Sequence, residues 1–255
     1  MIRVEFHCHT ERSFDAVTTE VDLATACVSR GIDVVTITEH DVFSASAGAE
    51  LRRKGVQAVL GCEFTCERGT HIIGLFLDRD LGVSGRSRRE IVSAIRAAEG
   101  VVYIPHPFKP GTGYFTAYDA DELLHEVDMM ELFNGGFRDD CDRDSIRRMA
   151  DDYGIRLVAG SDSHAPGHVG FYVSEYEADA ADDLRAVFRN QDPRLMVDAA
   201  HRGVPRANNW LQRRRSYQWL VQRFPPGLKQ PVKAALMKLR PGRHRRHIPR
   251  YVSVT

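Results

Sequence analysis

The sequence has 255 residues, of which 43% are hydrophobic, and a chain of this size and composition can bury a full core in one domain. Its five cysteines have no regular spacing, and no apolar run reaches the ~18 residues that a membrane-spanning helix needs. The composition therefore excludes a disulfide-rich secreted scaffold and a membrane-spanning protein, and we expect a cytoplasmic one.

The net charge of zero conceals an uneven distribution of charge. Residues 201–255 contain 14 Lys and Arg and no Asp or Glu, whereas acidic residues outnumber basic ones before residue 201. Arg-rich segments interrupted by prolines also replace the regular apolar pattern at this point. We predict a folded domain over residues 1–200 and a basic, partly helical extension over residues 201–255.

Short apolar runs alternate with helical patterns through residue 190. In chain order, we predict a strand at 2–6, a helix at 19–30, a strand at 33–38, a helix at 44–54, strands at 56–60 and 71–77, a helix at 87–99, a strand at 101–104, a helix at 119–126, a strand at 128–133, a helix at 142–153, strands at 155–159 and 169–174, and a helix at 178–190. Strands separated by helices favour an α/β fold with a mainly parallel sheet, either open or closed into a barrel.

Histidine and carboxylate side chains follow five of the predicted strands. They are His7 and His9, His40, Glu63, His106, and Asp162 with His164. Because the carboxyl ends of parallel strands meet at one edge of a sheet, we expect these side chains to converge there. Residues two apart in an extended segment point to the same side, so each His–X–His or Asp–X–His pair can share an ion. Imidazole and carboxylate ligands together suit zinc, manganese or iron, and more than four of them indicate more than one ion.

Seven segments in this order carry a family resemblance: EFHCHTERSFDA, TITEHD, GCEFTC, THIIGL, YIPHPF, MELFNG and GSDSH. Over residues 1–190 the sequence resembles the polymerase and histidinol phosphatase (PHP) superfamily of metal-dependent phosphoesterases. The resemblance implies a distorted (β/α)7 barrel with a trinuclear site, and we expect two to three divalent ions there. It assigns His7, His9, Glu63 and Asp162 to a first ion, Glu63, His71 and His106 to a second, and Asp15, His40 and His164 to a third. Two supporting positions differ, since Glu5 and Glu39 stand where the family often has Asp.

Such a site implies a phosphoesterase, and we predict that it hydrolyses a phosphomonoester by a metal-activated hydroxide.

 Asp162 and His164 are the candidates for proton transfer at this site as well as ligands. For the phosphorylated substrate, we predict contacts from Arg12, Arg68 and Arg138 in loops beside the ligand segments, from Asn134 at the end of a strand, and from His168 at the rim.

Two other functions fit the same residues. A 5'-3' exonuclease-type phosphodiesterase would use the basic extension to hold nucleic acid, and a regulatory module would bind metal without turnover. In the extension, an aromatic and aliphatic stripe through Trp210, Tyr217 and Phe224 lies among arginines. This pattern fits an anionic membrane surface, nucleic acid, or the acidic body of a neighbouring subunit, so the predicted cytoplasmic location includes peripheral membrane contact as an option.

Overall fold

The computed structural model describes residues 1–115, 122–136, 142–199 and 249–254. Seven strands close into a barrel in chain order, because β1 pairs with both β2 and β7. The barrel strands are β1 (Ile2–Cys8), β2 (Val34–His40), β3 (Gln57–Thr65), β4 (His71–Leu75), β5 (Val101–Ile104), β6 (Met129–Asn134) and β7 (Arg156–Ser163). The mixed α/β architecture and the closed barrel confirm the predicted fold class.

One barrel strand runs against the others. β4 is antiparallel to both of its neighbours, β3 and β5, whereas the remaining barrel pairs are parallel. Only residues 66–70 separate β3 from β4, and a connection this short allows a hairpin but no crossover to a parallel strand. The first residue of β4 therefore lies at the same edge of the barrel as the last residues of the parallel strands.

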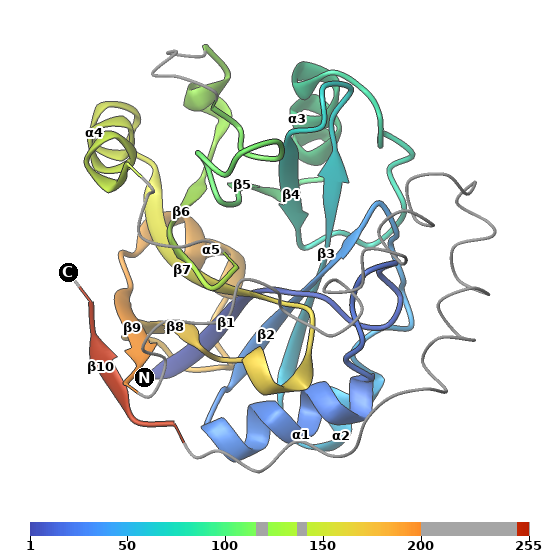
Figure 1. The fold of residues 1–255 in the computed structure, drawn as a ribbon, viewed down its shortest axis with the longest axis vertical. Coiled ribbons are helices and arrows are strands. Elements are labelled where there is room, and N and C mark those ends of the chain that lie inside the picture. The colour runs from blue at the N-terminus through green and yellow to red at the C-terminus, as the bar shows by residue number, and fades with distance from the viewer. Residues whose placement is uncertain (116–121, 137–141, 200–248, 255) are drawn as a thin grey trace.

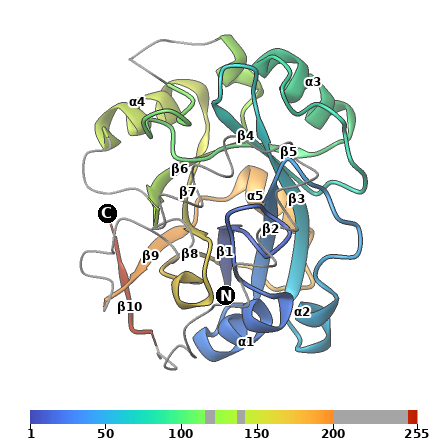
Figure 2. The same ribbon diagram turned by 45° about the vertical axis from the view of Figure 1, so that its right-hand side comes forward.

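Three further strands extend the sheet beyond the barrel. The amino-terminal half of β1 pairs antiparallel with β8 (Tyr172–Tyr176), which pairs with β9 (Arg194–Asp198), and β9 pairs with β10 (Tyr251–Ser253). Figure 2 shows this extension beside the barrel, with the C-terminus on its outer strand. The last two of these strands were not predicted. The predicted domain boundary near residue 201 stays a prediction, but residues 251–253 belong to the same sheet as the barrel.

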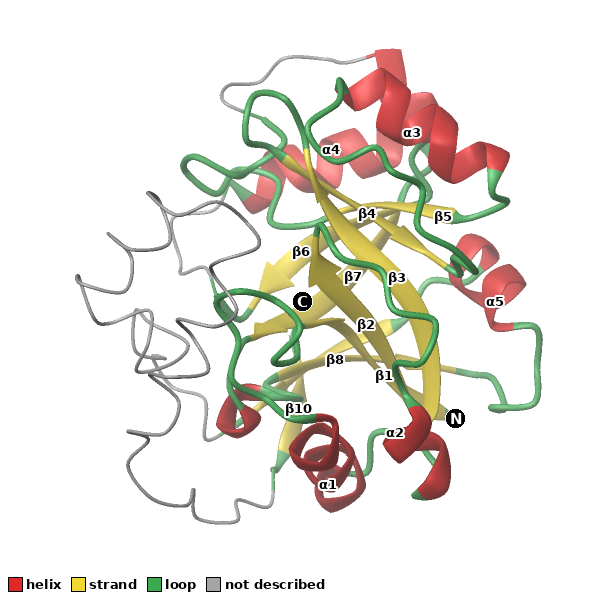
Figure 3. Ribbon diagram, turned by 90° about the vertical axis from the view of Figure 1, so that its right-hand side faces the viewer, coloured by secondary structure: helices red, strands yellow, loops and turns green. Residues whose placement is uncertain are grey.

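In the described parts of the chain, the helices lie on the outside of the strands (Figure 3). They are α1 (Glu20–Arg30), α2 (Ala49–Arg53), α3 (Arg88–Ala97), α4 (Arg143–Tyr153) and α5 (Leu184–Asn190), with 3-10 turns η1 (Glu122–Glu126) and η2 (Pro166–His168). Figure 1 places α1 and α2 together at one end of the molecule and α3 and α4 at the other. Within the described residues, no helix has the length and apolar character needed to cross a membrane.

Local signals explain where the helices begin and end. Thr19 caps α1 through its side chain, which accepts a hydrogen bond from the backbone N–H of Asp22, and Gly31 ends the helix in a left-handed conformation. The predicted helix 44–54 is shorter in the structure because Gly48 has φ 82°, which a right-handed helix cannot include. The predicted helix 178–190 likewise starts only after its cap, Asp183.

Apolar side chains from every barrel strand fill the barrel. This cluster includes Phe6, Val34, Val59, Ile73, Tyr103, Met129 and Val158. The rings of Phe6 and Tyr103 meet edge to face with centroids 6.0 Å apart. The Tyr103 hydroxyl donates to the Glu131 carboxylate, so the apolar interior is joined directly to the polar residues at the edge of the barrel.

Candidate metal centre

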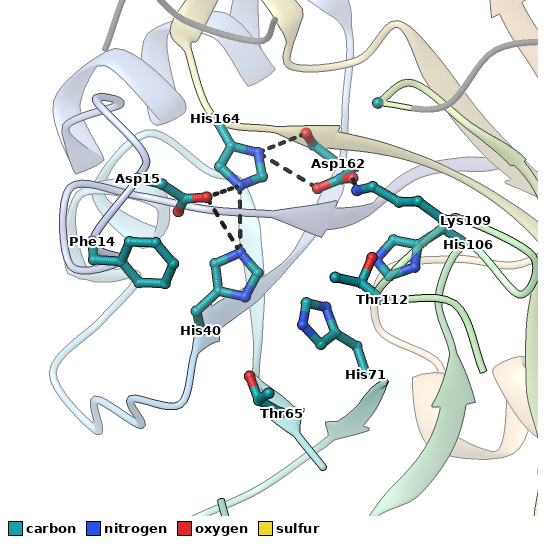
Figure 4. A pocket seen from close by; sticks show the side chains of 11 residues that line it. Phe14, Asp15, His40, Thr65, His71, His106, Lys109, Thr112, Asp162 and His164 are labelled. Carbon is teal, nitrogen blue, oxygen red and sulfur yellow. Dashed lines mark hydrogen bonds and ion pairs between the residues drawn. The ribbon is translucent and has the colours of Figure 1, made fainter. Parts of the chain in front are cut away.

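The structure brings all nine predicted ligands into one cluster at the carboxyl edge of the barrel, and Figure 4 shows six of them. Each ligand lies within 3.7 Å of another, and together they are His7, His9, Asp15, His40, Glu63, His71, His106, Asp162 and His164. The reversed direction of β4 accounts for His71, since this residue opens its strand and yet lies at the edge where the parallel strands end.

Glu63 lies at the centre of the cluster, and its two carboxylate oxygens face different histidines. Oε1 is 2.6 Å from His71 Nδ1 and 3.2 Å from His106 Nε2. Oε2 faces three other ring nitrogens, His7 Nε2 at 3.1 Å, His9 Nε2 at 3.3 Å and His40 Nδ1 at 3.1 Å. A carboxylate in this position can bridge two cations, one on each oxygen.

The other two carboxylates each serve one side of the cluster. Asp162 Oδ1 is 3.5 Å from the nearest ring nitrogen of His7, of His9 and of His164. Asp15 Oδ2 is 3.2 Å from His164 Nε2 and 3.7 Å from His40 Nε2. The contacts therefore fall into three overlapping groups, one around each carboxylate.

Three of the ligands have a backbone conformation that is rare outside glycine. His7, His106 and Asp162 have φ values of 70°, 31° and 48°. Conformations of this kind cost free energy and persist where the surrounding structure imposes them, most often at functional sites. Gly160 makes the room for one of them, because a Cβ atom there would lie 3.0 Å from His7 Cβ and 2.5 Å from Glu131 Oε1.

Hydrogen bonds outside the cluster orient the histidines. His7 Nδ1 is 2.9 Å from Glu131 Oε1, and His164 Nδ1 is 2.9 Å from the backbone carbonyl of Asp162. A carbonyl oxygen can only accept, so His164 Nδ1 carries a proton and its Nε2 is available toward Asp15 and His40. The same arrangement at His7 directs its Nε2 toward Glu63 and Asp162, as is usual for histidines that bind metal.

Glu131 is the supporting residue that sequence reasoning did not single out. Its Oε2 accepts from the backbone N–H of His106 at 2.6 Å and from Asn134 Nδ2 at 2.7 Å, in addition to the contacts with His7 and Tyr103. The sequence carries a signal for it, because Glu131 is the only acidic residue within the apolar run of β6. A buried carboxylate in such a run has to be paired, which indicates a network.

Two further glutamates hold the segments that carry ligands. Glu39 accepts from the backbone N–H groups of Thr10 and Ser13, each at 3.0 Å, and so holds the loop between His9 and Asp15. Glu5 accepts from the backbone N–H of Ser161 at 3.0 Å, next to Asp162. These are the two positions where the family often has Asp, and the longer side chain reaches its partners in both cases.

The electrostatics of the cluster favour cationic ligands. Burial by itself would raise the pKa of Asp162, but Lys109 and His7 hold it well below its usual range. Burial lowers the pKa of His40 to about 3, and burial with the nearby Lys109 lowers the pKa of His106 to about 4. Burial by itself would also lower the pKa of His7 and His9, but Asp162 and Glu63 raise it, to about 9 for His9. Metal binding requires neutral imidazoles, so a cation bound here would displace the protons of His7 and His9.

The donor set also fits divalent ions by geometry. Four groups of three side chains place one donor atom each within 4.8 Å of one another: His9, His40 and His164; His7, His106 and Asp162; His7, His9 and Glu63; and His40, Glu63 and His71. His9 Nε2 lies close to Glu63 and Asp162 but forms a hydrogen bond with neither, and the buried His106 Nδ1 has no hydrogen-bond partner among the described residues. Nitrogen and carboxylate donors with unused capacity suit manganese, zinc or iron.

A pocket of about 350 Å³ opens over this cluster. Its lining includes Asp15, His40, His71, His106, Asp162 and His164, and it also includes Phe14, Thr65, Lys109, Thr112 and Gly136. Lys109 contributes an ammonium group to this lining, and its Nζ lies 3.0 Å from Asp162 Oδ2. Sequence reasoning missed Lys109, although it follows the ligand His106 by three residues.

The predicted substrate contacts lie elsewhere or have other partners. Arg12 pairs with Glu20 at 3.0 Å, Arg68 is exposed, and His168 stacks on Phe171. The Asn134 side chain donates to Glu131 and accepts from the backbone N–H of Gly136 at 2.8 Å. None of these four residues is in the pocket lining, and Arg138 lies outside the described residues. Their roles toward substrate stay predictions.

Comparison with known sequences identifies relatives. A family model described as PHP-associated matches residues 142–193. An uncharacterized protein of Methanocaldococcus jannaschii is 29% identical over 151 residues, which is 54% of this chain and 85% of that protein. A 5'-3' exoribonuclease of Haemophilus influenzae is 29% identical over 82 residues, which is 30% of each chain.

Solved structures share the fold at low sequence identity. A two-domain protein of Bacteroides vulgatus, described as containing a predicted PHP-like metal-dependent phosphoesterase, is 17% identical with a TM-score of 0.61, over 76% of this chain and 64% of that one. The lesion-specific endonuclease PfuEndoQ of Pyrococcus furiosus is 17% identical with a TM-score of 0.55, over 76% of this chain and 57% of that one. The chain thus spans less than two thirds of either protein.

Proposed function

We propose that this chain is a member of the PHP superfamily and a metal-dependent phosphoesterase that hydrolyses a phosphomonoester with two to three divalent ions at the nine-ligand cluster. The observation that carries the proposal is that the two carboxylate oxygens of Glu63 face different sets of histidines. Its Oε1 faces His71 and His106, and its Oε2 faces His7, His9 and His40. When bound, divalent ions supply positive charge for the phosphoryl oxygens and lower the pKa of water.

The residues of the chain have distinct tasks in this proposal. His7, His9, Glu63 and Asp162 would hold a first ion, Glu63, His71 and His106 a second, and Asp15, His40 and His164 a third. Glu131 keeps the His7 ring in position through Nδ1. His164 directs Nε2 toward the pocket, where it would ligate an ion or, with both ring nitrogens protonated, pass a proton to the leaving oxygen.

The size of the pocket supports a small or terminal phosphate group. A volume of about 350 Å³ is at the lower end of the range for small-molecule sites. The endonuclease and the exoribonuclease among the similar proteins make a nucleic-acid phosphodiester the second candidate substrate. In that case the basic residues 201–248, which lie outside the described part of the chain, would hold the strand, and binding would weaken steeply with salt.

The test is phosphate release by manganese-supplemented protein from a panel of phosphomonoesters, phosphodiesters and short RNAs. We expect release from monoesters, its loss in Asp162→Ala, and no change in Asp192→Ala, which removes an exposed carboxylate paired with Arg156. Release of nucleotides from RNA would favour the nuclease. Metal binding without hydrolysis of any substrate would contradict the enzyme and favour a regulatory module.

A further inference from the structure

One wall of the pocket is formed by the loop that follows β5. Lys109 and Thr112 both come from this loop, and both line the pocket next to the ligand His106. Figure 4 places Lys109 beside Asp162 and Thr112 beside His106 and His71. The loop therefore adds a cation and a hydroxyl to a cluster that otherwise consists of imidazoles and carboxylates.

Backbone hydrogen bonds hold this loop in place. The N–H of Lys109 donates to the carbonyl of His106 at 3.0 Å, and the N–H of Gly113 donates to the carbonyl of Lys109 at 2.6 Å. The carbonyl of Thr112 accepts from the N–H of His71, the first residue of β4, at 3.0 Å. Gly113 permits the turn, because a Cβ there would lie 2.5 Å from Lys109 N. Both side chains thus project from a backbone that is already ordered.

The two side chains have donor capacity directed to the pocket. Lys109 Nζ contacts Asp162 Oδ2 at 3.0 Å, on the carboxylate oxygen that does not face the histidines, and an ammonium group has three donors. Its side chain is 29% exposed, so it is reachable from the pocket. Thr112 Oγ1 is buried and has no hydrogen-bond partner among the described residues. A buried hydroxyl without a partner is costly and indicates a ligand that would complete it.

Space at this point is kept open by glycine. A Cβ at Gly136 would lie 2.6 Å from Asp162 Oδ2, the oxygen that Lys109 contacts. The same Cβ would lie 3.2 Å from Asn134 Oδ1, so any larger residue at this position would press on both side chains. Glycine at position 136 therefore leaves room beside the oxygen that Lys109 contacts.

We propose that Lys109 and Thr112 form the specificity site for the substrate, in which they donate hydrogen bonds to the phosphoryl oxygens while the metal ligands face the other side of the group. This inference rests on the proposed function and adds a cation to the arginine contacts predicted from the sequence. An ammonium group is a compact charge without the planar fork of a guanidinium, so it suits a terminal phosphate that presents several oxygens.

The experiment measures binding of inorganic phosphate to the manganese-loaded full-length protein by calorimetry, together with manganese content. Lys109→Met and Thr112→Val should each weaken phosphate binding, Lys109→Met by about tenfold or more, while manganese content stays at the wild-type value. Thr112→Ser should restore binding because it restores the hydroxyl. The matched control is Lys54→Met, which removes an exposed lysine whose Nζ contacts Thr25.

Three results would overturn the inference. Wild-type phosphate affinity in both Lys109→Met and Thr112→Val would show that neither side chain contacts phosphate. Loss of manganese in Lys109→Met with no effect of Thr112→Val would assign Lys109 to the support of Asp162 alone. Absence of phosphate binding by the wild-type protein would also contradict it. Failure of the proposed function would give a different result. The wild-type protein would then bind phosphate through Lys109 and Thr112 but would release no phosphate from any ester.

Discussion

The carboxyl edge of the barrel and the β8–β10 extension belong to one sheet, but they use buried carboxylates in different ways. In the extension, Glu175 on β8 pairs with two arginines, Arg3 Nε at 2.7 Å and Arg194 Nε at 3.1 Å, whose charges belong to the chain itself. At the edge, Glu63 is surrounded by five histidines and no Lys or Arg among the described contacts. The charge of Glu175 is balanced by arginines of the chain itself, whereas the described contacts of Glu63 are histidines, which fits the metal binding proposed for this edge.

Replacement of the central carboxylate should have the largest effect. Glu63→Gln removes the charge that the five histidines share and places an amide where two cations would be bridged. Since a metal ion contributes several kcal/mol to transition-state stabilisation, phosphate release should fall by about a thousandfold. Manganese content, measured by elemental analysis, should fall with it. Full manganese content and full turnover would contradict the central role of Glu63.

Loss of a supporting carboxylate should have a smaller effect. Glu131→Gln leaves all nine ligands in place but weakens the hydrogen bonds that orient His7 and His106. Partners of this kind are worth about 10–100-fold in metal affinity or activity, and we expect manganese affinity to fall by that factor. Glu175→Gln is the matched control in the extension and should leave manganese affinity unchanged. Equal effects of the two variants would remove the distinction between the two regions.

Removal of the last strand should lower the free energy of unfolding and leave the rate of hydrolysis unchanged. Ending the chain at Arg250 deletes β10, which pairs with β9, and the Val254 N–H that donates to the Leu195 carbonyl at 2.9 Å. We expect a loss of about 3 kcal/mol, or about 6–12 °C in Tm, with turnover per folded molecule retained. An unchanged Tm would show that β10 contributes no stability.

A single hydroxyl in the extension should have the smallest effect. The Tyr251 hydroxyl donates to the carbonyl of Gly170 at 2.8 Å, close to the turn that follows His164. Tyr251→Phe should therefore lower the free energy of unfolding by about 1 kcal/mol, measured by urea denaturation. The KM and kcat of the variant should stay at the wild-type values. A large loss of kcat with unchanged stability would mean that the extension also positions the site.

Most of the fold could be predicted from local signals. The threonine cap and the terminal glycine define α1 within one residue, and the apolar runs locate all of the barrel strands. The reversal of β4 was not predicted, because the direction of a strand depends on its neighbours in the sheet. The strands β9 and β10 were also missed, since β10 is short and acquires its partner only across more than 50 residues of sequence.

The spacing of His7 with His9 and of Asp162 with His164, together with the family resemblance, was enough to predict the candidate metal ligands. The contacts of each carboxylate oxygen depend on the folded barrel, which also brings Lys109 and Glu131 to the site. The physical reason is distance: a spacing of two residues fixes local direction, whereas contacts between β1, β3, β5 and β7 arise only when the barrel closes.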